Sequence, residues 1–419
     1  MLLDFRVKNF RSLRDEQVLS LVAATDKSLH ECNTVASGVK AAPFLLRSAA
    51  IYGPNASGKS NLIKALQFMR GVVVESATAM RPDQTFNIQS FLLDAKSPTQ
   101  PTEFEVTFLL DGIRYQYGFA LTAQRITQEH LLVYKAAKPQ QWIHRTFDEA
   151  TGKDIYDLGS GLKGDKSLWE RTTRPNTLFL SMAAHLNSEQ LLPIFHWFAH
   201  KLAILNDAAP LNLQFSLDML RKPEGKQAIC AFLSTADLSV ADINVVPRKV
   251  PSRVVHFDAE TGQTSVGNNE QEIYELYFHH VATGGKATFG LQDESTGTRN
   301  LLFFAGPILD VLEKGLTLVI DELNNSLHPM IVRRLVGMFH NPKLNAHGAQ
   351  LIFVTHDTSL LDADLLRRDQ IWFVEKDSAQ ASKLYPLLDF SPRKHEALER
   401  GYLIGRYGAL PFFGNDREG

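Results

Sequence analysis

The sequence predicts an α/β fold that combines an antiparallel sheet near its N-terminal half with a largely parallel core sheet. Apolar residues alternate with polar ones over 103–110 and again over 113–121, on the two sides of Asp111-Gly112. This period of two around an Asp-Gly turn predicts a β-hairpin. The same alternation over residues 3–8 predicts a half-buried strand close to the N-terminus.

Three short apolar runs in the C-terminal part of the chain predict parallel strands: Leu316 to Ile320, Gln350 to Thr355 and Gln370 to Glu375. A helix-like segment, Met330 to Phe339, follows the first run and is introduced by Pro329. Short apolar strands that alternate with helices are typical of a parallel sheet whose two faces are covered.

The spacing of apolar residues and the polarity of the sequence change between these two regions. This change predicts a mainly helical insertion. Segments 187–206 and 213–234 have helix-like spacing, whereas 251–270 is polar and turn-rich. We therefore expect residues 1–140 and 286–419 to form the two halves of one domain and residues 141–285 to form the insertion.

The composition indicates a soluble globular chain with a large core, since 44% of its residues are hydrophobic and 21% are charged. The net charge of −2 provides no overall basic field, so any direct contact with DNA would need a local patch or a partner. The basic runs RRDQ, 367–370, and RKP, 221–223, are expected to be solvated surface rather than a DNA track.

The two cysteines, Cys32 and Cys230, are far apart and have no metal-like neighbours, which argues against a disulfide framework or a zinc site. The N-terminus has no long apolar segment of the secretory type, and no run of about 18 apolar residues occurs. We therefore expect a cytoplasmic protein that does not span a membrane.

The stretch 52–61 reads YGPNASGKSN and matches the phosphate-loop pattern G-x-x-x-x-G-K-S, from Gly53 to Ser60. In such a loop the backbone N–H groups surround a β-phosphate, Lys59 reaches the β- and γ-phosphates, and Ser60 ligates Mg²⁺. The alternative is a glycine-rich strand-to-helix turn that binds no ligand.

Two further predicted strands end in side chains that could bind a metal ion or take part in catalysis. TLVIDE, 317–322, ends an apolar strand in two carboxylates. Asp321 would hold Mg²⁺ beside Ser60, and Glu322 would orient or deprotonate the attacking water. LIFVTHD, 351–357, ends the next strand in His356, where a neutral imidazole would contact a γ-phosphate or the water. The alternative for each is an ordinary structural strand end.

The segment ESTGTRNLL, 294–302, precedes the carboxylate strand and opens an apolar helix. Ser295 and the N–H groups around Gly297 would be available to a phosphate. The equally simple interpretation is a well-capped helix start.

The order of these motifs resembles the ABC-type ATPase heads of the SMC, RecF and OLD-like group, over residues 1–121 and 283–380. The resemblance implies an ABC-type P-loop ATPase head that uses ATP and Mg²⁺. It implies nucleotide contacts from Asn55, Gly58, Lys59, Ser60 and Asn61, Mg²⁺ ligation by Ser60 and Asp321, catalysis by Glu322 and sensing by His356.

The same resemblance implies that two copies of the chain share a site. Ser295, Gly297 and Thr298 would complete the site of a second subunit across a dimer. Arg11, in the turn NFRS, would lie close to the nucleotide, and Gln89 is the candidate for the glutamine that senses Mg²⁺.

Two departures separate the chain from transporters of this group: ESTGT replaces LSGGQ, and NNSLHP, 324–329, replaces the SALD turn. The narrower resemblance is to bacterial anti-phage ATPases of the RloA, AbiL and AriA type. It rests on NFRSLRDEQVLSLVA, GPNASGKSNLIKAL, ESTGTRNLL, DELNNSLHP, THDTSLLD, RRDQIWFVEKD and GRYGALP. Those ATPases act alongside a separately encoded effector, often a nuclease.

The leading hypothesis is therefore an ATP-hydrolysing sensor, dimeric or of higher order, that controls a separately encoded nuclease or toxin in anti-phage defence. A RecF-like DNA-repair ATPase that binds DNA directly is the alternative, and a nucleotide-gated scaffold with marginal hydrolysis is a third hypothesis. Only 63 residues follow His356, and 405–415 reads as a turn-rich segment. We expect no nuclease domain in this tail.

Overall fold

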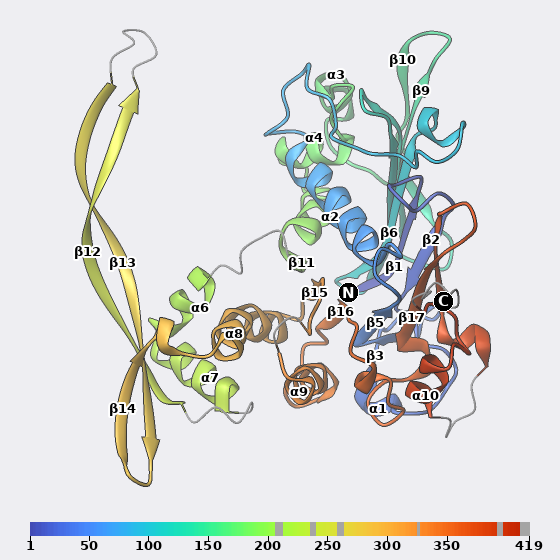
Figure 1. Cartoon of the computed structure of the whole chain (residues 1–419). Coiled ribbons are helices and arrows are strands. Elements are labelled where there is room, and N and C mark those ends of the chain that lie inside the picture. Colours follow the sequence, from blue (N-terminus) through green and yellow to red (C-terminus); the bar gives the residue numbers. More distant parts are fainter. Residues whose placement is uncertain (206–212, 235–239, 258–263, 325–326, 392–396, 411–419) are drawn as a thin grey trace, which may run out of the picture. The chain divides into compact units, whose positions relative to one another are not determined.

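The computed structural model describes residues 1–205, 213–234, 240–257, 264–324, 327–391 and 397–410 (Figure 1). The chain divides into two compact units. Unit 1 comprises Met1–Ala208, Val311–Asn325 and Leu335–Gly419, and unit 2 comprises Ala209–Asp310 and Ser326–Arg334. Among the helices described, none combines the length and the apolar character that a membrane crossing requires.

Unit 1 contains a seven-stranded antiparallel sheet in the order β10-β9-β8-β7-β6-β1-β2. Its strands are β1 Leu2–Lys8, β2 Gln17–Ser20, β6 Thr102–Leu110, β7 Ile113–Leu121, β8 Ile126–Tyr134, β9 Gln140–Asp148 and β10 Lys153–Asp157. The predicted N-terminal strand and hairpin are confirmed. Asp111 and Gly112 have φ of 51° and 75°, as the two-residue turn between β6 and β7 requires.

The second sheet of unit 1 has the order β11-β15-β16-β5-β17-β18. Its strands are β5 Ser48–Tyr52, β11 Leu202–Leu205, β15 Thr317–Ile320, β16 Gln350–Val354, β17 Ile371–Lys376 and β18 Ser382–Pro386. All neighbours are parallel except β17 and β18. The predicted α/β class, with an antiparallel part and a parallel core, is confirmed.

The strand β11 lies within a segment that we predicted to be helical, 187–206. Its four residues, LAIL, pair in parallel with β15. A short apolar run has no periodicity that separates a strand from a helix, so tertiary pairing decides the outcome.

Helix α2, Lys59–Glu75, shares one hydrophobic core with both sheets of unit 1. Further elements of the unit are α1 His30–Asn33, β3 Thr34–Ala36, β4 Phe44–Leu46, α3 Lys166–Thr172, α4 Phe179–His185, α5 Leu192–His196, a π-helical turn Trp197–Lys201 and α10 Leu398–Leu403. Short 3₁₀ turns lie at Ser97–Thr99, Thr358–Leu360, Arg368–Gln370 and Leu387–Phe390. Helix α9, Pro329–His340, begins in unit 2 and ends in unit 1.

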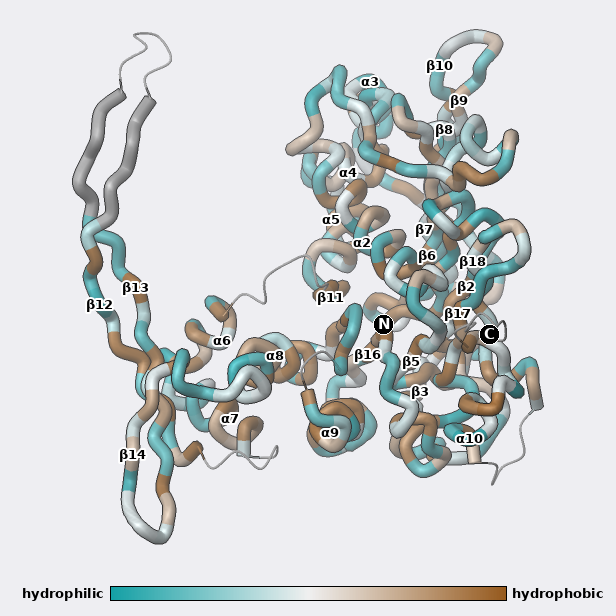
Figure 2. Tube along the Cα trace, in the orientation of Figure 1, coloured by the Kyte–Doolittle hydropathy of each residue, from teal (hydrophilic) through white to brown (hydrophobic). Residues whose placement is uncertain are grey.

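Unit 2 contains a three-stranded antiparallel sheet beside short helices. Its elements are α6 Leu213–Leu220, α7 Pro223–Ser234, β12 Val240–Phe257, β13 Thr264–Ala282, β14 Gly285–Gly290 and a 3₁₀ turn Leu291–Asp293. Helix α8, Thr296–Lys314, begins in this unit and continues into unit 1. Figure 2 shows hydrophobic residues on β12 and β13 beside α6 and α7.

The region 141–285 therefore differs from the mainly helical insertion that we expected, because it also contains β9, β10 and the long strands β12 and β13. In the part of β13 whose side chains are described, Leu276 and Phe278 are buried, whereas residues 270–272 are exposed. The first half of this strand, TSVGNNEQE at 264–272, has the composition of a loop, and this concealed the strand in the sequence.

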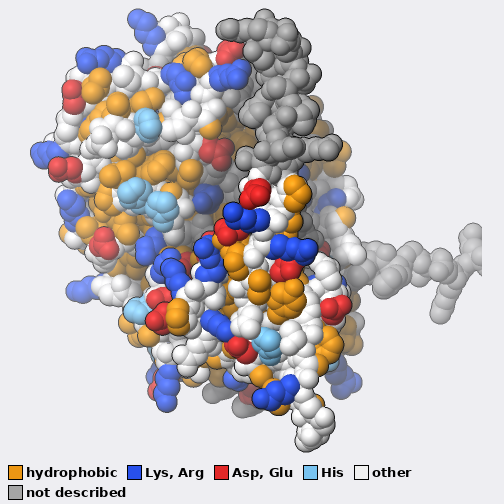
Figure 3. Space-filling model, turned by 90° about the vertical axis from the view of Figure 1, so that its left-hand side faces the viewer, with side chains coloured by type: hydrophobic (Ala, Val, Ile, Leu, Met, Phe, Trp, Pro, Cys, Tyr) orange, Lys and Arg blue, Asp and Glu red, His pale blue; other side chains and the backbone are white. Residues whose placement is uncertain are grey.

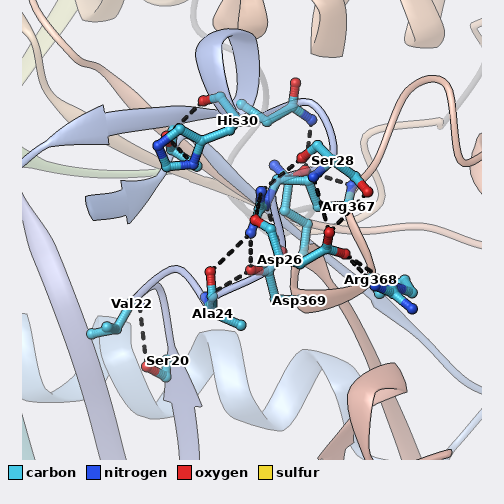
Figure 4. Close-up of polar contacts among 12 residues, drawn as sticks. Ser20, Val22, Ala24, Asp26, Ser28, His30, Arg367, Arg368 and Asp369 are labelled. Carbon is cyan, nitrogen blue, oxygen red and sulfur yellow. Dashed lines mark hydrogen bonds and ion pairs between the residues drawn. The ribbon is translucent and has the colours of Figure 1, made fainter. Parts of the chain in front are cut away.

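The run RRDQ also differs from expectation, because Arg367 is only 1% exposed. Figure 4 shows its guanidinium among the carbonyls of the segment that follows β2, with Asp369 beside it. It donates to the carbonyls of Asp26 and Ser28, both at 2.7 Å, and forms an ion pair with Asp369 at 2.6 Å. Arg368 pairs with the Asp26 carboxylate. These arginines hold a loop in place instead of forming a basic surface.

Candidate functional site

The phosphate loop follows β5, whose five residues are all buried, and leads into α2. Gly53 and Gly58 have φ of 153° and 109°, values that favour glycine. A Cβ added to Gly53 would strike the carbonyl oxygen of Val374, and one added to Gly58 would strike the hydroxyls of Ser382 and Ser12. The loop therefore has the close-packed backbone cradle that a phosphate site needs.

Lys59 lies inside this cradle and is 6% exposed. Its Nζ donates to the carbonyl oxygens of Gly53 and Pro54, both at 2.8 Å. Burial lowers the pKa of Lys59 to about 8, while the carboxylates of Asp321 and Glu322 oppose this shift. The structure thus brings the predicted lysine and the two predicted carboxylates into one electrostatic environment.

The carboxylate pair follows β15, which lies between β11 and β16. The N–H of Asp321 donates to the carbonyl of Leu205 at 3.0 Å, and the N–H of Leu323 donates to that of Val354 at 3.1 Å. Between these two anchors Glu322 has φ of 57°, in the left-handed region that few non-glycine residues adopt. The ends of both neighbouring strands hold Glu322 in this conformation.

His356 follows β16, the strand next to β5. Its pKa lies below the ordinary value, first because the ring is partly desolvated and second because of the Lys59 ammonium, whereas Asp321 opposes the shift. The ring is therefore neutral at neutral pH. Asn324 Oδ1 accepts from Thr355 Oγ1 at 3.0 Å and from the N–H of His356 at 3.4 Å, which links the turn after Glu322 to the histidine.

A cavity of about 790 Å³ in unit 1 borders the loop and the histidine. Its walls include the loop residues 53–57, His356 and three residues of the C-terminal segment, Tyr402, Leu403 and Leu410. The turn-rich character predicted for 405–415 is confirmed over 405–410, and 411–415 lie outside the described residues. This wall was not predicted, because the segment GRYGALP, 405–411, indicated only turns and a family resemblance and no contact with the loop.

The remaining predicted residues of the loop differ in their surroundings. Asn55 is exposed and lines the cavity, whereas Ser60, the second residue of α2, is half-buried. The Nδ2 of Asn61 donates to Ser12 Oγ at 2.7 Å. Asn61 therefore contacts the turn after β1 with its side chain.

Arg11 and Gln89 lie beside each other at that turn. The N–H of Arg11 donates to the carbonyl oxygen of Gln89 at 2.8 Å, and both residues are exposed. The function of Gln89 as a Mg²⁺ sensor stays a prediction.

The serine segment belongs to unit 2. Ser295 precedes α8, and its Oγ accepts from the N–H of Thr298 at 3.1 Å and lies 2.8 Å from Thr298 Oγ1. This is the capped helix start that we considered as one interpretation. The phosphate role predicted for Ser295, Gly297 and Thr298 stays a prediction.

The residues present fit a nucleotide–Mg²⁺ complex. Mg²⁺ at phosphate sites takes one or two protein oxygens together with phosphate oxygens and water. The Ser60 hydroxyl and the Asp321 carboxylate are oxygen donors of this kind. Among the described residues no group of three or more His, Cys, Asp and Glu side chains is arranged to hold a metal ion.

The depressed pKa of Lys59 predicts that ATP binding depends on pH. A bound phosphate favours the charged ammonium and raises its pKa, so binding at pH 8 should take up about half a proton, and affinity should fall as the pH rises above 8. Calorimetric titration in two buffers of different ionisation enthalpy measures this uptake. Lys64→Ala, on the same helix, should bind ATP with the same uptake, whereas Lys59→Ala should bind weakly. Tight ATP binding without proton uptake at pH 8 would contradict the role of Lys59.

Comparisons with solved structures find SMC heads at low similarity. An SMC head domain from Thermotoga maritima is 15% identical with a TM-score of 0.42, and the match covers 92% of this chain and 98% of that chain. An Smc head with an extended coiled coil, bound to the C-terminal domain of ScpA derived from Pyrococcus furiosus, is 13% identical with a TM-score of 0.39, covering 97% and 98%. A search of curated proteins finds no match.

A family model matches residues 48–362, about three-quarters of the chain. Its description is "AAA domain, putative AbiEii toxin, Type IV TA system". The matched residues contain the phosphate loop, the carboxylate pair and His356. The chain therefore belongs to this family of AAA-type ATPase domains.

Proposed function

We propose that this chain binds ATP with Mg²⁺ and hydrolyses it to ADP and phosphate, in the cytoplasm, as the nucleotide-dependent sensor of a defence system. One observation carries the proposal. Three adjacent parallel strands, β5, β16 and β15, end at one edge of the sheet and bring Lys59, His356 and the pair Asp321-Glu322 together there. Parallel α/β sheets bind ligands at this edge.

Each of these residues has a separate role in the proposed hydrolysis of ATP. Lys59 and the backbone N–H groups of the loop hold the phosphates, with the Ser60 hydroxyl and the Asp321 carboxylate as the protein ligands of Mg²⁺. Bound Mg²⁺ would neutralise charge that develops on the phosphates. Glu322 accepts a proton from the attacking water, and the neutral His356 contacts that water or the γ-phosphate.

The proposed active form contains two copies or more. Unit 1 carries the phosphate loop and the carboxylates, whereas unit 2 carries Ser295, Gly297 and Thr298. We propose that these three residues act on the nucleotide of a second copy, so that self-association depends on ATP. The N–H groups at the start of α8 are suitable phosphate donors.

The defence role is supported by the family description, which refers to a toxin and a toxin–antitoxin system. We propose that the chain controls a separately encoded effector, a nuclease or toxin, as ATPases of the RloA, AbiL and AriA type do. A DNA-repair ATPase that binds DNA directly is less well supported. Figure 3 shows acidic and basic side chains interspersed on the face in view, and the net charge is −2. Duplex binding depends on clustered positive charge.

Glu322→Gln is the variant that tests hydrolysis. It keeps the shape of the side chain but cannot accept a proton, so turnover should fall by about 100-fold or more while ATP remains bound. Phosphate release and nucleotide retention on the purified chain measure the two effects. Glu313→Gln removes the same charge from an exposed position of α8, before β15, and should leave both values unchanged. Unimpaired turnover in Glu322→Gln would remove Glu322 from the catalytic role.

The effector should reside in another chain. The purified protein is expected to hydrolyse ATP without cutting DNA or RNA in Mg²⁺ or Mn²⁺, and cutting or toxicity should appear only when the neighbouring gene is co-expressed. Salt-dependent DNA binding of the isolated chain distinguishes the repair alternative. Nuclease activity that co-purifies with this chain alone and persists in Lys59→Ala would refute the two-component proposal.

A further inference from the structure

Two serines that are not part of the loop lie against it at Gly58. Ser382, the first residue of β18, is 1% exposed, and its Oγ lies 2.5 Å from the carbonyl oxygen of Ser57. The same Oγ lies 2.8 Å from the Oγ of Ser12, in the turn after β1. The Ser12 hydroxyl also accepts from Asn61 Nδ2 at 2.7 Å. The three side chains thus form one continuous hydrogen-bonded chain that ends on the loop.

One arrangement of protons satisfies all three contacts. The Ser57 carbonyl can only accept, the Asn61 amide nitrogen can only donate, and each hydroxyl has a single proton. Ser382 therefore donates to Ser57, Ser12 donates to Ser382, and Asn61 donates to Ser12. In this arrangement Ser382 fixes the direction of the Ser57 carbonyl.

The direction of that carbonyl sets the direction of the next N–H. In a planar trans peptide the C=O and N–H groups point to opposite sides, so the N–H of Gly58 points away from Ser382. Backbone N–H groups at this position of a phosphate loop bind phosphate oxygens. The absence of a side chain on Gly58 is what allows both hydroxyls to approach, since a Cβ there would strike them.

Both serines are attached to ordered elements. The N–H of Ser382 donates to the carbonyl of Ser12 at 2.7 Å, and Ser382 pairs with Lys376 in the β17–β18 hairpin. Two residues along, Arg14 lies 3.5 Å from Asp377 in the turn of the same hairpin. The hairpin and the turn after β1 are therefore joined at the point where they contact the loop.

We propose that Ser382, supported by Ser12, is a positioning residue that presents the Gly58 N–H to the phosphates. The inference rests on the proposed nucleotide-binding function and deepens it. Without the Ser382 hydroxyl the Ser57 carbonyl loses the hydrogen bond that fixes its direction, and phosphate binding must then order the Ser57–Gly58 peptide. The serines act through the backbone and do not touch the nucleotide.

Calorimetric titration of the full chain with ADP and Mg²⁺ tests the proposal. In Ser382→Ala the Kd for ADP should rise about tenfold, the effect of one preorganised hydrogen bond. Ser12→Ala should have a smaller effect, because Ser382 still donates to Ser57. The double variant should come close to Ser382→Ala alone, since Ser12 reaches the Ser57 carbonyl only through Ser382.

A matched control is Ser181→Ala. Ser181 is also fully buried and donates to a backbone carbonyl, that of Val73 at 2.6 Å, but this carbonyl lies far along α2 from the loop. Its loss should lower stability about as much as the loss of Ser382 Oγ while ADP affinity is unchanged. This separates a positioning role from a general loss of stability.

The ADP affinities of wild type and variants distinguish a failure of the positioning role from a failure of the proposed nucleotide-binding function. If wild type binds ADP, Lys59→Ala does not, and Ser382→Ala binds as tightly as wild type, the inference alone is overturned. Equal losses in Ser181→Ala and Ser382→Ala would also overturn it. If wild type binds no ADP, the proposed function fails as well. Should Ser382→Ala fail to fold, the half-exposed Ser12 provides the test, and an unchanged ADP affinity in Ser12→Ala then counts against the proposal.

Discussion

The buried ammonium of Lys59 is the interaction on which the rest of the site depends. Its Nζ lies 2.8 Å from two carbonyl oxygens of its own loop, and the carboxylates of Asp321 and Glu322 act against the desolvation that lowers its pKa. Desolvation of the ring, and after it the same ammonium, depress the pKa of His356. The charge of Lys59, which follows β5, thus interacts with side chains at the ends of β15 and β16. A phosphate that enters the loop offers Lys59 stronger acceptors than the two carbonyls, since hydrogen bonds between ionised groups are the stronger ones.

The backbone around this charge is held in conformations that side chains seldom allow. Glu322 has a positive φ, and hydrogen bonds to the two neighbouring strands hold the residues on either side of it. Gly58 also has a positive φ, at a point where the hydroxyls of two serines lie against it. Strained backbone of this kind persists only where the surrounding structure over-determines it. These contacts fix the backbone at this edge of the parallel sheet, and the proposed binding and hydrolysis of a nucleotide would require less ordering there.

Local sequence signals were sufficient for much of this arrangement. The Asp-Gly turn and the period of two predicted β6 and β7, and apolar runs predicted β15, β16 and β17. Because the carboxyl ends of parallel strands meet at one edge, the placement of Asp321 and His356 near Lys59 followed from strand assignment alone. The motifs and their order were therefore enough to propose that Lys59, Asp321 and His356 belong to one site.

The features that the sequence did not predict depend on partners far along the chain. Arg367 is buried because carbonyls of residues 24–28 surround it, more than 300 residues away. Ser382 contacts the loop only because β18 follows β17 beside β5. The strand β11 is too short to show a period, and half-polar β12 and β13 resemble loops in composition. The segment after Ser295 could be identified as a helix start from its sequence. The group that its N–H donors contact could not be identified in this way.

The proposed complete site combines the phosphate loop of one copy with the Ser295 segment of another. The most direct measurement is ATP turnover of two inactive variants, Lys59→Ala and Ser295→Arg, separately and mixed in equal amounts. With a shared site, a mixed dimer has one intact loop facing one intact Ser295 segment, so the mixture should recover about a quarter of wild-type turnover. A mixture that stays as inactive as its components, although both variants fold and associate, would contradict the account.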